Sequence, residues 1–243
     1  MPVYGSFAEL YDRFTYDVSY AEFADHYEKV FAAAGKSPKT VLDLACGSGS
    51  LTAVMAERGY EMISVDASPE MLSIAREKCA ELSGITPPLF LCQPMGELDL
   101  YGTVDAAVSS LDSLNYLPPE ELNELFRLLR LFIEPQGLFI FDINAPERLR
   151  SLDGQISVDE DEDGLCLWRA ELNEDATALL YGIDIFKKRG RFWQRDFEEH
   201  VEYIHEPKML KSLLEQAGFT GIELSDGGPH AELGRLFFAA RNG

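Results

Sequence analysis

The residues best placed to do chemistry form a glycine-rich turn that follows a short apolar segment. Thr40–Leu44 has the β-branched and apolar side chains of a buried strand, and Ala45-Cys46-Gly47-Ser48-Gly49 comes directly after it. Because Gly47 and Gly49 lack a Cβ, the backbone can turn sharply here and approach a ligand closely. Residues 51–58 have a helical composition, so a helix N-terminus, which favours polar and anionic ligand groups, should face the same space.

An acidic residue follows this turn at a distance that is typical of nucleotide-type ligand sites. Residues 62–65 predict a second strand, and Asp66 at its end lies 23 positions after Asp43. A carboxylate about 20 residues beyond a glycine turn is placed to accept hydrogen bonds from ribose hydroxyls. The dinucleotide fingerprint requires a third glycine three residues after the second, but that position is Thr52. The spacing therefore disfavours a dinucleotide.

The pattern Asp43-x-x-x-Gly47-x-Gly49 resembles the cofactor-binding turn of class I S-adenosylmethionine-dependent methyltransferases. The resemblance covers most of the chain. It is strongest for the small bacterial type, with a looser similarity to sugar N-methyltransferases and glycine N-methyltransferase. It implies an α/β fold with a Rossmann-like, mostly parallel seven-stranded sheet of order 3-2-1-4-5-7-6 and helices on both faces. It also implies S-adenosylmethionine as the cofactor.

The resemblance further implies a role for each residue that matches a family position. Backbone groups of Ala45 and Gly47 would hold the methionine portion of the cofactor, with Asp43 near its ammonium group. Asp66 would accept from the ribose hydroxyls. The complete set of expected cofactor-binding residues is Tyr11, Asp43, Ala45, Gly47, Gly49, Asp66, Ala67, Met71, Gln93, Met95 and Leu111.

Adenine contacts are expected from three separate segments. Met71 and Leu111 could sandwich the ring. Gln93, in the turn before Met95, could bind its polar edge, because an amide both donates and accepts hydrogen bonds. An ordinary surface loop is the alternative interpretation for Gln93.

The N-terminal region predicts two helices, over residues 6–16 and 20–34. Phe7-Ala8-Glu9-Leu10-Tyr11-Asp12 matches the F-A-x-x-Y-D pattern of a helix that lies across the cofactor in the resembled family. This match implies that residues 1–37 form a helical lid and that Tyr11 contacts the methionine end of the cofactor. Core packing of the aromatic stripe is the alternative.

The side of the site that would face the methyl acceptor is predicted from the loop after a fourth strand, residues 104–109. Polar groups just past the carboxyl end of a central strand are where ligands bind in an open α/β sheet. Asp112 and Tyr116 are the catalytic candidates in this loop. An alternative role for Asp112 is to cap a turn.

The order of elements predicts one domain with an insertion. Strands and helices alternate through a fifth strand, 138–143, which indicates a parallel sheet covered on both sides. Alternation with period two from about residue 154 to 205 then predicts antiparallel strands. We expect residues 1–147 and 206–243 to form the core. Residues 148–205 would form the insertion, covering the acceptor site or making dimer contacts.

His205 is the third tentative catalytic candidate, placed at the end of the insertion. It could line the acceptor pocket, with a surface imidazole as the alternative. No metal site is expected. The acidic run Asp159–Asp163 resembles the start of a calcium loop, but the twelfth position is Ala170 instead of Glu, so a solvated hairpin end is favoured.

Composition limits the partners. The formal net charge is −21, from 42 acidic and 21 basic residues, which argues against nucleic acid and anionic membrane surfaces. No apolar run approaches the roughly 20 residues of a membrane helix, and the N-terminus lacks signal-peptide features, so a cytoplasmic monomer or homodimer is expected. Four cysteines without paired spacing predict reduced, buried thiols.

The expected function is transfer of a methyl group to an N or O nucleophile of a small molecule. Two other classes stay open. One is a non-catalytic protein that binds the cofactor, a nucleotide or a partner. The other is an NAD-dependent oxidoreductase, against which Thr52 in place of the third glycine speaks.

Overall fold

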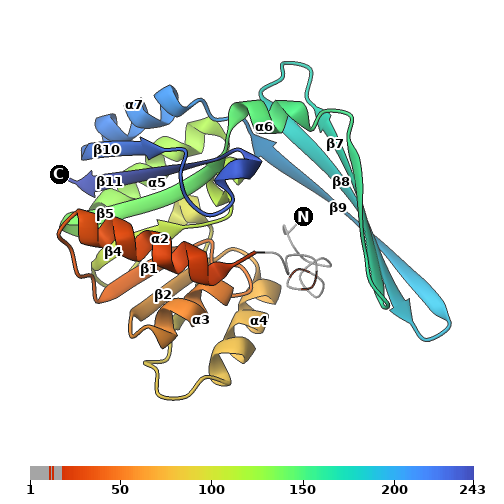
Figure 1. Ribbon diagram of the computed structural model, residues 1–243, viewed down its shortest axis with the longest axis horizontal. Coiled ribbons are helices and arrows are strands. Elements are labelled where there is room, and N and C mark those ends of the chain that lie inside the picture. The colour runs from red at the N-terminus through yellow and green to blue at the C-terminus, as the bar shows by residue number, and fades with distance from the viewer. Residues whose placement is uncertain (1–10, 12, 14–17) are drawn as a thin grey trace.

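The computed structural model describes residues 11, 13 and 18–243, and its strands form two sheets (Figure 1). The strands of the larger sheet are β1 (Thr40–Leu44), β2 (Glu61–Asp66), β3 (Leu89–Cys92), β4 (Val104–Ser109), β5 (Ile133–Asn144), β10 (Phe219–Ser225) and β11 (Arg235–Asn242). They are ordered β10-β11-β5-β4-β1-β2-β3, with β11 antiparallel to its neighbours and the strands from β5 to β3 parallel. The predicted order 3-2-1-4-5-7-6 is confirmed, since β10 and β11 are the sixth and seventh strands of this sheet along the chain.

Helices cover both faces of the larger sheet. The helices are α2 (Tyr20–Ala33), α3 (Ser50–Glu57), α4 (Pro69–Ala80), α5 (Pro119–Phe132), α6 (Pro146–Ser151) and α7 (Pro207–Ala217), with 3-10 turns η1 (Met95–Glu97), η2 (Ser113–Tyr116) and η3 (Ala231–Leu233). Buried side chains of α5 and α7 pack on one face of the sheet, and those of α2 and α3 pack on the other. The short helix α6 was not predicted from the sequence.

Helix α5 shows how the apolar pattern builds the core. Pro119 stands at its first position, where the missing N–H costs nothing. Leu122, Phe126 and Leu129 recur at helical spacing and are fully buried. They face β5, whose stacked rings Phe139 and Phe141 have centroids 4.8 Å apart. A strand covered on both faces is apolar nearly throughout, as the sequence of β5 predicted.

Strand β5 begins five residues before the predicted fifth strand, 138–143. The strand runs without a break from Ile133, and its pairing with β4 passes from Val104–Ile133 to Ala106–Leu138 across an irregularity. Gln136 has a φ of 67° there. Between these two pairs, β5 contains more residues than β4 does. The extra residues of β5 are accommodated as in a β-bulge.

The insertion forms a second, four-stranded antiparallel sheet. Its strands are β6 (Ile156–Glu160), β7 (Gly164–Leu172), β8 (Ala178–Arg189) and β9 (Phe192–Tyr203), paired in chain order. Figure 1 shows β7, β8 and β9 extending away from the core beside the first sheet. Lys187, Lys188 and Arg189 are the last residues of β8.

The acidic run lies in the turn between β6 and β7. The carboxylate of Asp161 accepts hydrogen bonds from the backbone N–H groups of Asp163 (2.9 Å) and Gly164 (2.8 Å), and it forms an ion pair with Arg13. Among residues 11, 13 and 18–243, no group of three or more His, Cys, Asp and Glu side chains is arranged to hold a metal ion. The turn is therefore a hairpin end whose carboxylate satisfies backbone donors.

Two further expectations concern the surface. Cys46, Cys79 and Cys166 are buried, but Cys92 is exposed at the end of the edge strand β3, so the prediction of four buried thiols is wrong at that position. Within the part of the chain that the structure describes, no helix has the length and apolar character needed to cross a membrane.

Gly49 offers a test of how tightly the glycine turn packs. Its φ is 74°, and a Cβ at this position would lie 2.6 Å from Cβ of Ala75. Gly59 also has a positive φ, of 95°, but a Cβ there would meet none of the described atoms within 4 Å. We expect Gly49→Ala to lower the free energy of unfolding by about 3 kcal/mol, from backbone strain and overpacking together. Gly59→Ala should cost about 1 kcal/mol.

Urea denaturation of both variants measures this difference. Equal losses of stability in Gly49→Ala and Gly59→Ala would show that the contact with Ala75 is not limiting.

Candidate functional site

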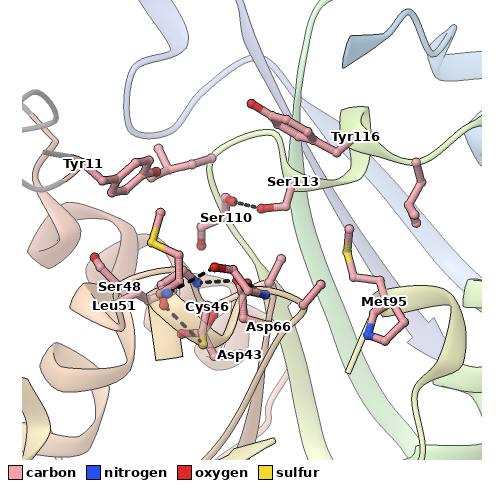
Figure 2. Close-up of a pocket in the computed structure, with 18 of the residues that line it drawn as sticks. Tyr11, Asp43, Cys46, Ser48, Leu51, Asp66, Met95, Ser110, Ser113 and Tyr116 are labelled. Carbon is pink, nitrogen blue, oxygen red and sulfur yellow. Dashed lines mark hydrogen bonds between the residues drawn. The ribbon is translucent and has the colours of Figure 1, made fainter. Parts of the chain in front are cut away.

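A cavity of about 360 Å³ opens at the carboxyl edge of the larger sheet. Segments that follow β1, β2 and β4 line it, together with residues of the N-terminal region (Figure 2). In Figure 2, Asp43, Cys46 and Asp66 lie on one side of the space, and Tyr11 and Tyr116 lie on the opposite side. The cavity is thus at the place where parallel strands deliver their connecting loops.

The glycine turn forms one wall through Asp43, Ala45 and Gly47. Ala45 and Gly47 both have positive φ angles, of 61° and 54°. The turn is attached to β2, because the backbone N–H of Cys46 donates to the carbonyl of Val65 at 2.9 Å. The backbone of the turn is therefore fixed close to the cavity, as the sequence predicted.

Asp66 connects the glycine turn to the next helix. One carboxylate oxygen accepts from the backbone N–H of Gly47 at 2.8 Å, and the other accepts from that of Ser68, also at 2.8 Å. Ser68 in turn caps α4, where its Oγ accepts from the N–H of Met71 at 3.2 Å. Burial raises the pKa of Asp66, although the backbone donors oppose that change. Asp66 and Ala67 line the cavity together with Met71.

Asp43 is 1% exposed and lies under the turn. The hydroxyl of Thr52 donates to its carboxylate at 2.5 Å and lies 2.9 Å from the hydroxyl of Ser64. Burial raises the pKa of Asp43 to about 7. Thr52 stands where a dinucleotide site has its third glycine, and here its hydroxyl is a hydrogen-bond partner for the buried carboxyl of Asp43. The sequence showed the substitution but not this contact.

Apolar side chains provide the walls for a flat ring. Met71 and Leu111 both line the cavity, as does Met95. Tyr11 lines it from the N-terminal region and also packs against a buried cluster of the insertion sheet formed by Cys166, Ile183 and Ile185. The rest of the predicted lid motif lies outside the described residues.

The wall after β4 is more polar. Tyr116 lines it, and Ser113 Oγ donates to the carbonyl of Ser110 at 2.7 Å. The hydroxyls of Ser110 and Tyr27 are 2.5 Å apart. Tyr27 is fully buried, and burial raises the pKa of its phenol. Sequence reasoning missed Ser110 and the Tyr27 hydroxyl behind it. The position of Ser110, just past the strand end, was the available signal.

Four of the predicted site residues do not line the cavity. Gly49 packs against α4. Gln93 closes its own loop, with its amide hydrogen-bonded to the backbone N–H and carbonyl of Asp99, both at 3.1 Å. The surface-loop alternative therefore describes its position.

Asp112 and His205 are also placed behind the cavity wall. The Asp112 carboxylate forms an ion pair with Arg235 at 2.8 Å. His205 is 0% exposed, and its Nε2 lies 3.1 Å from the carbonyl of Leu114. Neither expected position for His205, in the pocket lining or on the surface, is correct, because the ring is buried and contacts the carbonyl of Leu114 in η2.

Comparisons with known proteins identify the family. A family model described as a methyltransferase domain matches residues 41–137. YqeM of Bacillus subtilis (strain 168), which carries a methyltransferase name, is 30% identical over 246 residues, with 98% of this chain and 97% of YqeM covered. A solved S-adenosylmethionine-dependent methyltransferase from Clostridium acetobutylicum ATCC 824 is 26% identical, with a TM-score of 0.84 and 98% of both chains covered. The chain belongs to the class I S-adenosylmethionine-dependent methyltransferases.

The fold of this methyltransferase is shared more widely. The sugar N-methyltransferase KedS8 from Streptoalloteichus sp. ATCC 53650 is similar in fold, with a TM-score of 0.79 at 21% identity over 99% of this chain and 96% of that one. The cofactor is S-adenosylmethionine. The cavity suits it, because carboxylates lie beside the glycine turn and apolar side chains lie beyond them.

The buried carboxyl of Asp43 makes stability depend on pH. Its pKa in the folded protein, about 7, exceeds the ordinary value of 3.8, so the folded state binds a proton that the unfolded state releases between these values. The stability this provides is present below pH 4 and is lost as the pH rises through 7. The stability of Asp43→Asn relative to the parent protein should therefore increase with pH, from roughly 2 kcal/mol at pH 5 to roughly 4 kcal/mol at pH 8.

Thermal or urea unfolding at several pH values measures this gain. Asp99→Asn, at an exposed carboxylate, is the control and should follow the parent protein. A constant offset between Asp43→Asn and the parent protein across this range would rule out the assigned titration.

Proposed function

We propose that this methyltransferase moves the methyl group of S-adenosylmethionine to a nitrogen or oxygen nucleophile of a small molecule. The observation that carries this proposal is the continuity of one cavity from the glycine turn to the polar wall of Ser110, Ser113 and Tyr116. A cofactor held at the turn and an acceptor held at that wall would share one compartment. The cavity volume of about 360 Å³ suits small ligands.

Named residues would hold the cofactor. The Asp66 carboxylate would accept from ribose hydroxyls, and the backbone of Ala45 and Gly47 would bind the methionine portion. Asp43 would lie near the cationic ammonium group, which favours the ionised carboxylate. Support for these roles comes from the position of all four residues on one wall of the cavity.

Adenine would lie against the apolar part of the lining, between Met71 and Leu111 and beside Met95. Tyr11 would cover the methionine end from the lid. Support comes from the position of these side chains in the cavity lining. Ala67 continues this wall from Asp66.

The chemistry requires positioning more than activation. The sulfonium of the bound cofactor supplies an already activated methyl group. The protein has to orient the acceptor nucleophile toward that group and exclude water, and oriented reactants can account for about 7–11 kcal/mol of a barrier. Of the three predicted catalytic candidates, Tyr116 lines the cavity, whereas Asp112 and His205 do not. An uncharged amine acceptor needs no general base.

The insertion is proposed to cover the acceptor side. Tyr11 supports this role, because it lines the cavity and also packs against the Cys166–Ile183–Ile185 cluster of the second sheet. The net charge of −21 supports a small acceptor over a polyanion. KedS8, a protein of similar fold, is a sugar N-methyltransferase, which is consistent with an amine or hydroxyl acceptor.

Replacement of Asp66 tests its proposed contact with the cofactor. Asp66→Ala should weaken binding of S-adenosylmethionine by about tenfold or more, measured by calorimetry, because a charged acceptor for the ribose hydroxyls is lost. Asp105 provides a matched control at the opposite end of the sheet, since its carboxylate also accepts two backbone N–H groups, from Lys39 (2.7 Å) and Thr40 (2.9 Å). Asp105→Ala should lose stability but keep its affinity, and equal affinities in both variants would contradict the assignment.

The acceptor class is tested by incubating the protein with S-adenosylmethionine and pools of amines and hydroxylated metabolites. Release of S-adenosylhomocysteine together with a methylated small molecule is the expected result. For the acceptor found, Tyr116→Phe should raise the acceptor KM roughly tenfold without changing cofactor affinity. Methylation of RNA or protein alone, or binding without any turnover, would refute the proposal. The latter outcome would favour a non-catalytic binding protein.

A further inference from the structure

The cavity wall after β4 begins with an unusual backbone. Two consecutive residues that are not glycine, Leu111 and Asp112, have φ angles of 57° and 54°. This left-handed region is unfavourable for residues with a Cβ, and it persists in a protein only when the surroundings enforce it. Leu111 lines the cavity directly, and η2 follows at once with Ser113 and Tyr116. The position of these lining residues therefore depends on the two left-handed residues.

Asp142 holds both of them. It lies on β5 and is 0% exposed. One of its carboxylate oxygens accepts from the N–H of Leu111 at 3.0 Å, and the other accepts from the N–H of Asp112 at 2.9 Å. A buried carboxylate that binds two successive backbone donors fixes the orientation of both peptide groups.

Arg235 balances the charge of this carboxylate from the neighbouring strand. It lies on β11, where its partner on β5 is Asn144, two residues from Asp142. One guanidinium nitrogen, Nη1, donates to Asp142 and also to the carboxylate of Asp112 at 2.8 Å. The side chains of Arg235 and Asp112 are 10% and 14% exposed. A carboxylate as buried as that of Asp142 requires such a partner.

The far end of η2 is held by other contacts. The Asn115 amide accepts from the N–H of Asn144 at 3.0 Å and donates to the carbonyl of Tyr203 at 2.8 Å. His205 lies 3.1 Å from the carbonyl of Leu114. Because these contacts do not involve Asp142, its loss would release the start of the segment while leaving the end in place.

We propose that Asp142 and Arg235 are positioning residues for methyl transfer, which hold Leu111 and Asp112 in the left-handed conformation and thereby place Leu111, Ser113 and Tyr116 in the cavity. Neither residue lines the cavity, so both act through the loop. The proposal rests on the proposed binding of the cofactor in this cavity, and it does not depend on which acceptor is used. It also assigns Asp112 as an ion-pair partner within this network.

Cofactor affinity measures the proposal directly. If the left-handed conformation falls to about one tenth of the population, the apparent dissociation constant rises about tenfold, because only that fraction can bind. The probe is S-adenosylhomocysteine, with its affinity measured by calorimetry on the full chain and stability measured by urea unfolding. Asp142→Asn and Arg235→Met should each show a weakening of this order. Arg235→Lys should recover part of it, because it retains the charge.

A control on the same strand separates positioning from general destabilisation. Asn242, at the other end of β11, donates from its amide to the carbonyl of Ile133 at 2.5 Å. Asn242→Ala should lower stability and leave the affinity for S-adenosylhomocysteine unchanged.

Two outcomes would overturn the proposal. The first is unchanged affinity in folded Arg235→Met. The second is an equal loss of affinity in Asn242→Ala and Arg235→Met. Should Asp142→Asn fail to fold, the two Arg235 variants still decide between these outcomes.

Discussion

Carboxylates that each accept two backbone N–H groups are the interaction on which this structure depends. Asp66 holds Gly47 and Ser68, and Asp142 holds Leu111 and Asp112. A parallel sheet places the loops after β1, β2 and β4 at one edge. It supplies a partner for the N–H of Cys46, the carbonyl of Val65, but the next backbone donors of these loops need partners from side chains. The two strand-end carboxylates supply these partners. They therefore fix the conformation of the loops that form the walls of the cavity.

One aromatic side chain, Tyr11, connects the cavity to the insertion sheet. Tyr11 lines the cavity and also packs on the buried cluster of the antiparallel sheet, so this side chain contacts both. An ion pair between Arg13 and Asp161 adds a second contact, to the acidic turn of β6 and β7. The acidic run that resembled a metal loop thus has a role in the hairpin and in its contact with Arg13.

Local patterns in the sequence were enough to predict the strands, the glycine turn and the antiparallel insertion, because period and turn residues act over short distances. The order of the strands in the sheet came from the resemblance to class I methyltransferases. Contacts between distant positions were not predictable in this way. The ion pair of Asp112 joins residues 123 positions apart, and the contact of Thr52 with Asp43 depends on how α3 lies on β1. Burial of His205 likewise follows from the packing of β9 on η2. The periodicity of a single sequence contains no information on such a contact.

The strand order has a consequence for how the chain folds during synthesis. The partner of β5 on one side is β11, which is separated from it by the 90 residues from 145 to 234. The four insertion strands pair in chain order and can form as soon as they leave the ribosome, whereas an open edge of β5 must wait for β11. An unpaired apolar strand is a site for association with other chains. The nascent protein is therefore exposed to aggregation through this edge during the interval before β11 is made.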